Sequence, residues 1–198
     1  MMKKSLLLLA ALMLGGCATH WPETALLNPQ VIPSNQQYYS GNRITLEGVD
    51  KREAAYVFSI KKKEKAAVLV NSEQPLNNLL AEKLAEGLRS QGLEVGNSGT
   101  TNLTLAISSA AVTVEEKTFT YVTKSRVSLQ VIADFQGSKL TKQFNMSSSK
   151  EGPGEPSMAE LESILNQQLG SLLQQIMADD ALRGYLKGQP SSERRAKQ

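Results

Sequence analysis

Only one cysteine and one histidine occur among the 198 residues, and they lie close together near the amino terminus. Cys17 follows Gly15 and Gly16, and His20 lies three residues beyond it. A thiol in this setting could bind a metal, take part in redox chemistry or accept a covalent group. Zinc-type sites need several cysteine or histidine ligands, and the chain has no others. We therefore predict no metal and no cofactor, and we interpret His20 as a solvated residue.

The residues before Cys17 indicate how its thiol is used. Lys3 and Lys4 precede an apolar run over residues 6–14, and small residues follow that run. This order of charge, apolar core and small residues is typical of a secretory signal peptide. The run is too short to cross a bilayer as a helix, which needs about 20 residues. We predict that residues 1–16 are a signal peptide that the mature protein lacks.

The sequence "LGGC" at 14–17 resembles the lipobox of bacterial lipoproteins. The resemblance implies cleavage between Gly16 and Cys17, followed by acylation of Cys17 with chains such as palmitate. Two or more acyl chains anchor a protein stably, so the membrane is the first expected partner. Aspartate after the cysteine usually signals retention in the inner membrane. Alanine at position 18 therefore favours the outer membrane, with the protein facing the periplasm.

Other polar groups could do chemistry, but a simpler interpretation fits each of them. Residues 147–150, "SSSK", could supply a serine nucleophile and a lysine base, yet such runs at strand ends usually form polar turns. Asp50 and Arg52 could bind a ligand, but alternate residues on a strand pair readily. The carboxylates at 179–180 suit a helix cap better than a cation site. We predict no catalytic residue and no enzymatic activity.

The charge balance excludes one class of partner. Without residues 1–16 the 22 Lys and Arg fall to 20, which face 19 Asp and Glu. Nucleic-acid binding usually needs a clustered basic face, so we expect no nucleic acid as a partner. The one basic run, "KKKEK" at 61–65, is interpreted as a solvated hairpin turn. Contact with anionic head groups or glycan phosphates is the alternative for this run.

The mature chain is predicted to consist of an amino-terminal tether, a domain and a carboxy-terminal tail. Residues 17–42 are predicted to hold the lipidated cysteine and a flexible tether, because Pro22, Pro29 and Pro33 interrupt regular structure. Residues 43–187 form the predicted single periplasmic domain. Residues 188–198, "GQPSSERRAKQ", are predicted to be a disordered polar tail.

Within 43–187 the apolar pattern changes period several times. Alternation predicts a strand near 43–50 and a hairpin around the lysine run. Leucines spaced by three and four predict a helix from Pro75 to Gly92. Three alternating runs then predict an antiparallel meander over 103–146, with a bulge near 108–111. In the second run, the side chains predicted to face away from the core are Lys124, Arg126, Ser128 and Gln130. A Ser-x-x-Glu capping box at 157–160 starts a second long amphipathic helix, and Asp179 caps a short last one.

Nearly the whole mature chain resembles the YajG family of small bacterial lipoproteins. The resemblance rests on the lipobox and on four further stretches, which are "GVDKR" at 48–52, "QGLEV" at 91–95, "GSKLTKQF" at 137–144 and "ILNQQLGSLLQQIMADD" at 164–180. It implies an outer-membrane lipoprotein that faces the periplasm. None of these stretches is a catalytic signature, so only Cys17 is carried over as a functional residue.

These observations predict an α+β fold in which two main amphipathic helices pack on one face of a mostly antiparallel sheet. They also predict a non-enzymatic, lipid-anchored envelope lipoprotein that binds or supports another envelope component, with an envelope protein as its partner. The alternative is a ligand-carrying or transport-accessory lipoprotein with an apolar pocket between sheet and helices.

Overall fold

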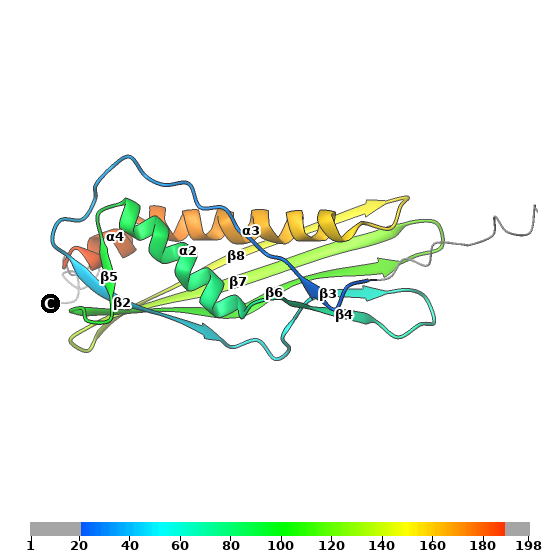
Figure 1. The fold of residues 1–198 in the computed structure, drawn as a ribbon, viewed down its shortest axis with the longest axis horizontal. Coiled ribbons are helices and arrows are strands. Elements are labelled where there is room, and N and C mark those ends of the chain that lie inside the picture. Colours follow the sequence, from blue (N-terminus) through cyan, green and yellow to red (C-terminus); the bar gives the residue numbers. More distant parts are fainter. Residues whose placement is uncertain (1–20, 189–198) are drawn as a thin grey trace, which may run out of the picture.

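A computed structural model describes residues 21–188 of the chain, as an elongated layer of helices on a long curved sheet (Figure 1). The predicted signal peptide, Cys17 and nearly all of the predicted tail lie outside these residues. Three helices follow the expected capping and apolar signals. They are α2 (Leu76–Ser90), α3 (Met158–Ala178) and α4 (Asp180–Leu186).

The helix signals in the sequence are confirmed. Ser157 accepts a hydrogen bond from the Glu160 amide and Glu160 reaches back to Ser157, which completes the predicted capping box. The Asp179 side chain accepts from the Leu182 amide and so caps α4. Gly92 follows α2 with φ +86°, a conformation that favours glycine. The leucines of α2 and α3 are buried against the sheet as core.

Eight strands form one sheet. They are β1 (Thr24–Ala25), β2 (Arg43–Asp50), β3 (Tyr56–Lys61), β4 (Val68–Ser72), β5 (Glu94–Gly96), β6 (Thr101–Glu116), β7 (Tyr121–Phe135) and β8 (Ser138–Gly152). The predicted meander is confirmed, because β6, β7 and β8 pair antiparallel in order. The predicted bulge is also present, as a shift in register between Ile107 and Ser109.

The sheet as a whole is mixed, so the prediction of a mostly antiparallel sheet was wrong. β2 and β3 lie one after the other along the same edge of β6, and both run parallel to it. β1 also pairs parallel with β4, and β5 pairs parallel with β2. Helix α2 carries the chain back between β4 and β5, which allows the parallel pairing. Alternation along a strand reveals its buried face but not the direction of its neighbour.

Residues 21–42, which we call the strap, run along the helix layer from one end of the molecule to the other (Figure 1). The Leu26 amide donates to Glu162 Oε1 at 3.0 Å, and the Asn28 amide donates to Asn166 Oδ1 at 2.8 Å. Further along, Gln174 Nε2 donates to the Ile32 carbonyl at 3.0 Å.

The strap also contributes to the core, since Ala25, Leu27 and Tyr39 are buried in it. This differs from the flexible tether expected over 17–42 and from a domain that begins at residue 43. Prolines and polar residues kept the strap from forming a helix or a long strand. Its apolar residues and backbone amides nevertheless found partners in α2, α3 and β4.

Candidate functional site

The predicted lipidation site lies just before the described residues. Cys17, Gly16 and His20 are outside them, and Trp21 is the first described residue, only 9% exposed within the core. Four peptide steps separate Cys17 from Trp21, a distance of at most about 14 Å when fully extended. A lipid on Cys17 would therefore hold the packed domain close to the membrane.

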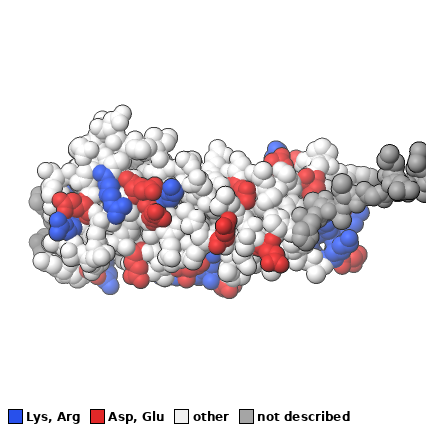
Figure 2. Space-filling view, viewed as in Figure 1, with Lys and Arg blue, Asp and Glu red and all other residues white. Residues whose placement is uncertain are grey.

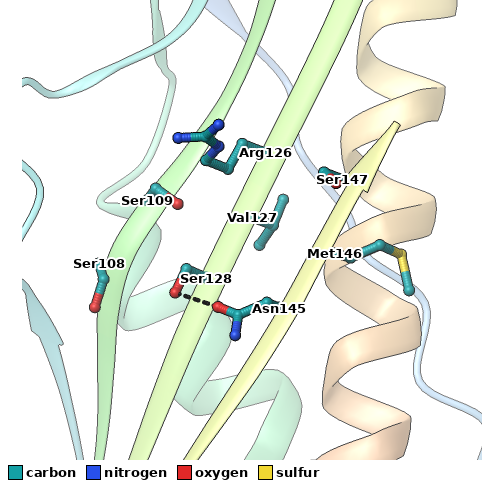
Figure 3. A pocket seen from close by; sticks show the side chains of 8 residues that line it. All are labelled: Ser108, Ser109, Arg126, Val127, Ser128, Asn145, Met146 and Ser147. Carbon is teal, nitrogen blue, oxygen red and sulfur yellow. Dashed lines mark hydrogen bonds between the residues drawn. The ribbon is translucent and has the colours of Figure 1, made fainter. Parts of the chain in front are cut away.

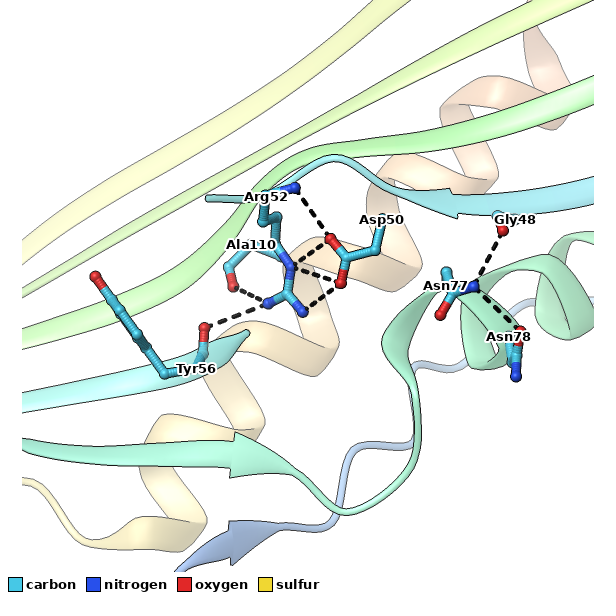
Figure 4. Close-up of polar contacts among 7 residues, drawn as sticks. All are labelled: Gly48, Asp50, Arg52, Tyr56, Asn77, Asn78 and Ala110. Carbon is cyan, nitrogen blue, oxygen red and sulfur yellow. Dashed lines mark hydrogen bonds and ion pairs between the residues drawn. The ribbon is translucent and has the colours of Figure 1, made fainter. Parts of the chain in front are cut away.

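The "GVDKR" motif forms a structural joint (Figure 4). Arg52 Nη2 lies 2.8 Å from Asp50 Oδ2, and the arginine side chain is only 7% exposed. Arg52 Nη1 also donates to the carbonyls of Tyr56 and Ala110, at 3.3 and 3.4 Å. The hydrogen bond from Arg52 lowers the pKa of the Asp50 carboxyl. The predicted ion pair therefore ties the end of β2 to β3 and to β6.

Gly48 of the same motif permits close packing of α2 on β2. A Cβ atom there would lie 2.2 Å from the Asn77 carbonyl oxygen. Asn77 Nδ2 donates in return to the Gly48 carbonyl at 3.0 Å (Figure 4). Every described contact of the motif thus serves the fold, and none leaves a free group directed at a ligand.

The serine–lysine run of β8 does not assemble a nucleophile. Ser148 faces the helices, where its hydroxyl lies 2.7 Å from Ser125 Oγ and accepts from Gln168 Nε2 at 3.3 Å. Ser147 lies on the opposite face of the strand (Figure 3). Within residues 21–188, Lys150 makes no hydrogen bond to either serine hydroxyl. This run is part of a paired strand, not the polar turn that the sequence suggested.

The face of β6, β7 and β8 that points away from the helices is polar and open; we call it the open face. It comprises Ser109, Ala111, Thr113, Lys124, Arg126, Ser128, Asn145, Ser147 and Ser149. A hollow of about 420 Å³ lies on it beside the bulge at Ser108, and Figure 3 shows the residues that line it. Ser128 Oγ donates to Asn145 Oδ1 at 2.7 Å beside this hollow.

Arg126 is the exposed charged residue at the centre of the open face. Ser109 and Ser128 flank its position on β6 and β7, and Ser147 pairs with it on β8. No residue of the described chain forms an ion pair or hydrogen bond with its guanidinium. Alternation predicted that Arg126 points away from the core. Its neighbours on β6 and β8 depend on strand register, which the sequence alone did not provide.

Other shifted groups in the described chain are explained by packing. Burial raises the pKa of Tyr39 to about 12, although the nearby Arg183 opposes this shift. Hydrogen bonds from Ser157 lower the pKa of Glu160 in the capping box. Among residues 21–188 no cluster of histidine, cysteine or carboxylate side chains could hold a metal ion. In the same residues no helix is long and apolar enough to span a membrane.

Comparison with known families identifies the class of protein. A family model described as an uncharacterized lipoprotein matches residues 29–187. The match covers most of the chain, including more than half of the strap and, among the described residues, every helix and all strands after β1. The chain therefore belongs to this bacterial lipoprotein family. No curated protein matches the sequence.

A solved structure shares the fold. A Xanthomonas campestris protein superposes with a TM-score of 0.60 at 8% identity, over 85% of this chain and 100% of that one. A putative lipoprotein from Caulobacter crescentus aligns with a TM-score of 0.39 at 16% identity, over 60% of this chain and 88% of that one. The first likeness shows a common fold and nothing about activity.

Proposed function

We propose that this protein is a YajG-like outer-membrane lipoprotein that binds another envelope protein without catalysis. Cleavage after Gly16 and acylation of Cys17 anchor it, and the domain faces the periplasm. Membership in the lipoprotein family and the lipobox support the anchor. The sequence offers no recognisable catalytic motif, and this supports a binding role rather than an enzymatic one.

One observation supports a binding role, namely the open face with the unpaired Arg126 at its centre. Helices and strap cover the other face of the same strands. Arginine is enriched in protein interfaces because its planar guanidinium forms several directed hydrogen bonds at once. The serine and asparagine side chains around it supply both donors and acceptors. We assign the partner's binding surface to this face.

Photo-crosslinking in intact cells tests this assignment. A photoreactive residue at Asn145, which is exposed on the open face, should give a recurrent adduct with one envelope protein. The same residue at Gln167, exposed on α3, is the matched control and should give none. Arg126→Glu should abolish the adduct without unfolding the protein, and Cys17→Ala should abolish it by removing the anchor. Absence of a recurrent adduct at Asn145, or an equal one at Gln167, would contradict the assignment.

One hollow in the structure supports the alternative function, a ligand-carrying lipoprotein. A space of about 440 Å³ lies between the start of α3, the start of β7 and the end of β8, with Tyr121 and Ile164 in its wall. Elsewhere the leucines between sheet and helices are fully buried in contact with one another. Native mass spectrometry of the purified lipoprotein decides this point, because a carrier should retain a bound lipid or small molecule.

A further inference from the structure

Three loops and the start of the strap meet at one end of the molecule, which we call the hairpin end. The loops are 62–67 between β3 and β4, 117–120 between β6 and β7, and 153–157 between β8 and α3. Lys62 Nζ lies 2.7 Å from Glu155 Oε1, and Thr120 Oγ1 donates to Glu151 Oε1 at 2.5 Å. These contacts bring the loops together, and Figure 1 shows them at the right-hand end.

The chain also enters the fold from this end. Thr24 pairs with Asn71 in the parallel β1–β4 ladder, so Trp21 lies three residues nearer to the tip of the β3–β4 hairpin. Cys17 is at most about 14 Å from Trp21. A membrane that holds Cys17 is therefore within reach of the hairpin end, whereas the β7–β8 turn lies at the far end of the long strands.

Exposed apolar side chains gather at the hairpin end. Five large apolar side chains are exposed among residues 21–188, and three of them lie on the β3–β4 and β6–β7 hairpins. Phe119 at the tip of the β6–β7 turn is 87% exposed, and Val68 and Leu69 follow the β3–β4 loop. A phenyl ring held in water at the tip of a turn gains free energy when it enters an apolar phase. This placement suits the boundary between head groups and acyl chains.

Lysines surround the apolar tips. Lys61, Lys63 and Lys65 lie in or beside the β3–β4 loop, and Lys117 lies next to Phe119 in sequence. Acidic side chains lie next to basic ones at the same right-hand end in Figure 2, where Lys63 Nζ lies 3.9 Å from Glu116 Oε1 and Lys117 Nζ lies 3.2 Å from Glu115 Oε2. Long lysine side chains near an apolar tip reach anionic head groups while the tip is inserted. Lys61 and Lys65 form no ion pair among residues 21–188, so these two lysines suit a phospholipid surface that contains anionic lipids.

We propose that the hairpin end docks on the phospholipid leaflet that holds the anchor, with Phe119 inserted at the level of the head groups. This inference rests on the proposed acylation of Cys17. Docking holds the long axis of the domain away from the membrane plane, so that the β7–β8 turn and α4 point into the periplasm. The open face then stands roughly perpendicular to the membrane, accessible to a partner from the side.

Fluorescence quenching of the mature lipoprotein in vesicles tests the docking. The vesicles contain phosphatidylethanolamine and phosphatidylglycerol, with a nitroxide-labelled phospholipid as quencher. Acylated Cys17 has no free thiol, so Thr118→Cys supplies the only site for an environment-sensitive label, next to an intact Phe119. Insertion should quench roughly half of this fluorescence, because the label then lies near the acyl boundary. A label at Lys139→Cys, at the opposite end of β8, is the control and should stay unquenched.

A second variant separates insertion from mere proximity. Phe119→Ser in the Thr118→Cys background should reduce the quenching about twofold or more, since the apolar wedge is lost. Protein that floats with the vesicles but shows equal, weak quenching at 118 and 139 overturns the docking and leaves the anchor intact. Protein that fails to float with the vesicles overturns the proposed acylation and the docking together.

Discussion

Helix α3 and the strap lie side by side along the same layer, yet they are held there in opposite ways. α3 buries nine of its residues, mostly leucines, and its apolar stripe is written in its own sequence. The strap is extended, has few buried side chains and relies on backbone groups that bond to α3. The position of α3 therefore follows from its own apolar pattern, whereas the position of the strap depends on groups that α3 provides.

The geometry of the contact explains why the two fit. Strap residues two apart meet helix residues four apart, as in the pairs Leu26–Glu162 and Asn28–Asn166. Two extended residues advance about 6.6 Å and four helical residues advance about 6 Å, so the two repeats stay nearly in step. Gly170, one further step along, leaves room for the Gln30 carbonyl.

The largest expected effect tests the helix side of this comparison. Leu169→Ala removes a fully buried side chain from α3 and should lower the free energy of unfolding by about 3 kcal/mol. Urea denaturation followed by circular dichroism measures the change. Gln167→Ala, on the exposed side of the same helix turn, is the control and should stay within about 0.5 kcal/mol of wild type. A loss below about 1 kcal/mol at Leu169 would contradict the assignment of α3 as the main core helix.

A pH titration tests the strap side. Tyr39 is buried near the end of the strap, and its pKa is raised from 10.0 to about 12. The neutral ring therefore contributes stability that is complete below pH 10 and is lost as the pH rises through 12, by about 2–3 kcal/mol. The strap should become sensitive to proteolysis over this alkaline range. Tyr39→Phe should remove that step, and an identical pH profile in the variant would rule out Tyr39 as its cause.

Substitutions at two glycines test the packing of the strap on α3. Gly170→Ala places a Cβ atom 2.5 Å from the Gln30 carbonyl oxygen, and should cost about 1–2 kcal/mol despite the better helix propensity of alanine. Gly184→Ala in α4 meets nothing within 4 Å and should instead gain up to about 1 kcal/mol. Thermal unfolding of both variants checks the opposite signs, and a gain at both positions would mean that the strap does not press on α3.

The smallest effect concerns a single hydrogen bond. Asn166→Ala removes the acceptor of the Asn28 amide and should cost about 0.5–1 kcal/mol, because the site is partly open to water. Hydrogen exchange should accelerate at the Asn28 amide while amides in the middle of α3 keep their protection. Faster exchange throughout α3 would show that strap and helix open together instead of separately.

The contrast between α3 and the strap also separates what the sequence could predict from what it could not. The leucine spacing of α3 and the capping box at Ser157 predicted the helix, because the signals are local. The strap was predicted to be a tether, since its partners are distant in sequence. One available signal was the line Glu162, Asn166, Gly170 and Gln174, which repeats every four residues on a face that a leucine stripe does not use.

The candidate sites differ in the same way, because one depends on adjacent residues and the other on residues brought together by the fold. The lipobox at Cys17 is read entirely from adjacent residues, so its chemistry could be predicted without a fold. Alternation also predicted that Arg126 points outward. The open face around Arg126 needed the register of β6 and β8 as well as the bulge at Ser108. Parallel pairing was missed for a similar reason, since strand direction depends on where β2 and β3 meet β6.

The strap also fixes an order of events in time. Its hydrogen-bonding partners on α3 lie 136, 138 and 142 residues further along the chain. Synthesis and export proceed from the amino terminus, so the strap emerges first and must wait for α3 before it can close. If Cys17 is acylated as proposed, its thiol can react while the rest of the chain is still open. Closure of the strap on α3 is therefore a late step of folding, and the closed domain begins four residues after the proposed lipidation site at Cys17.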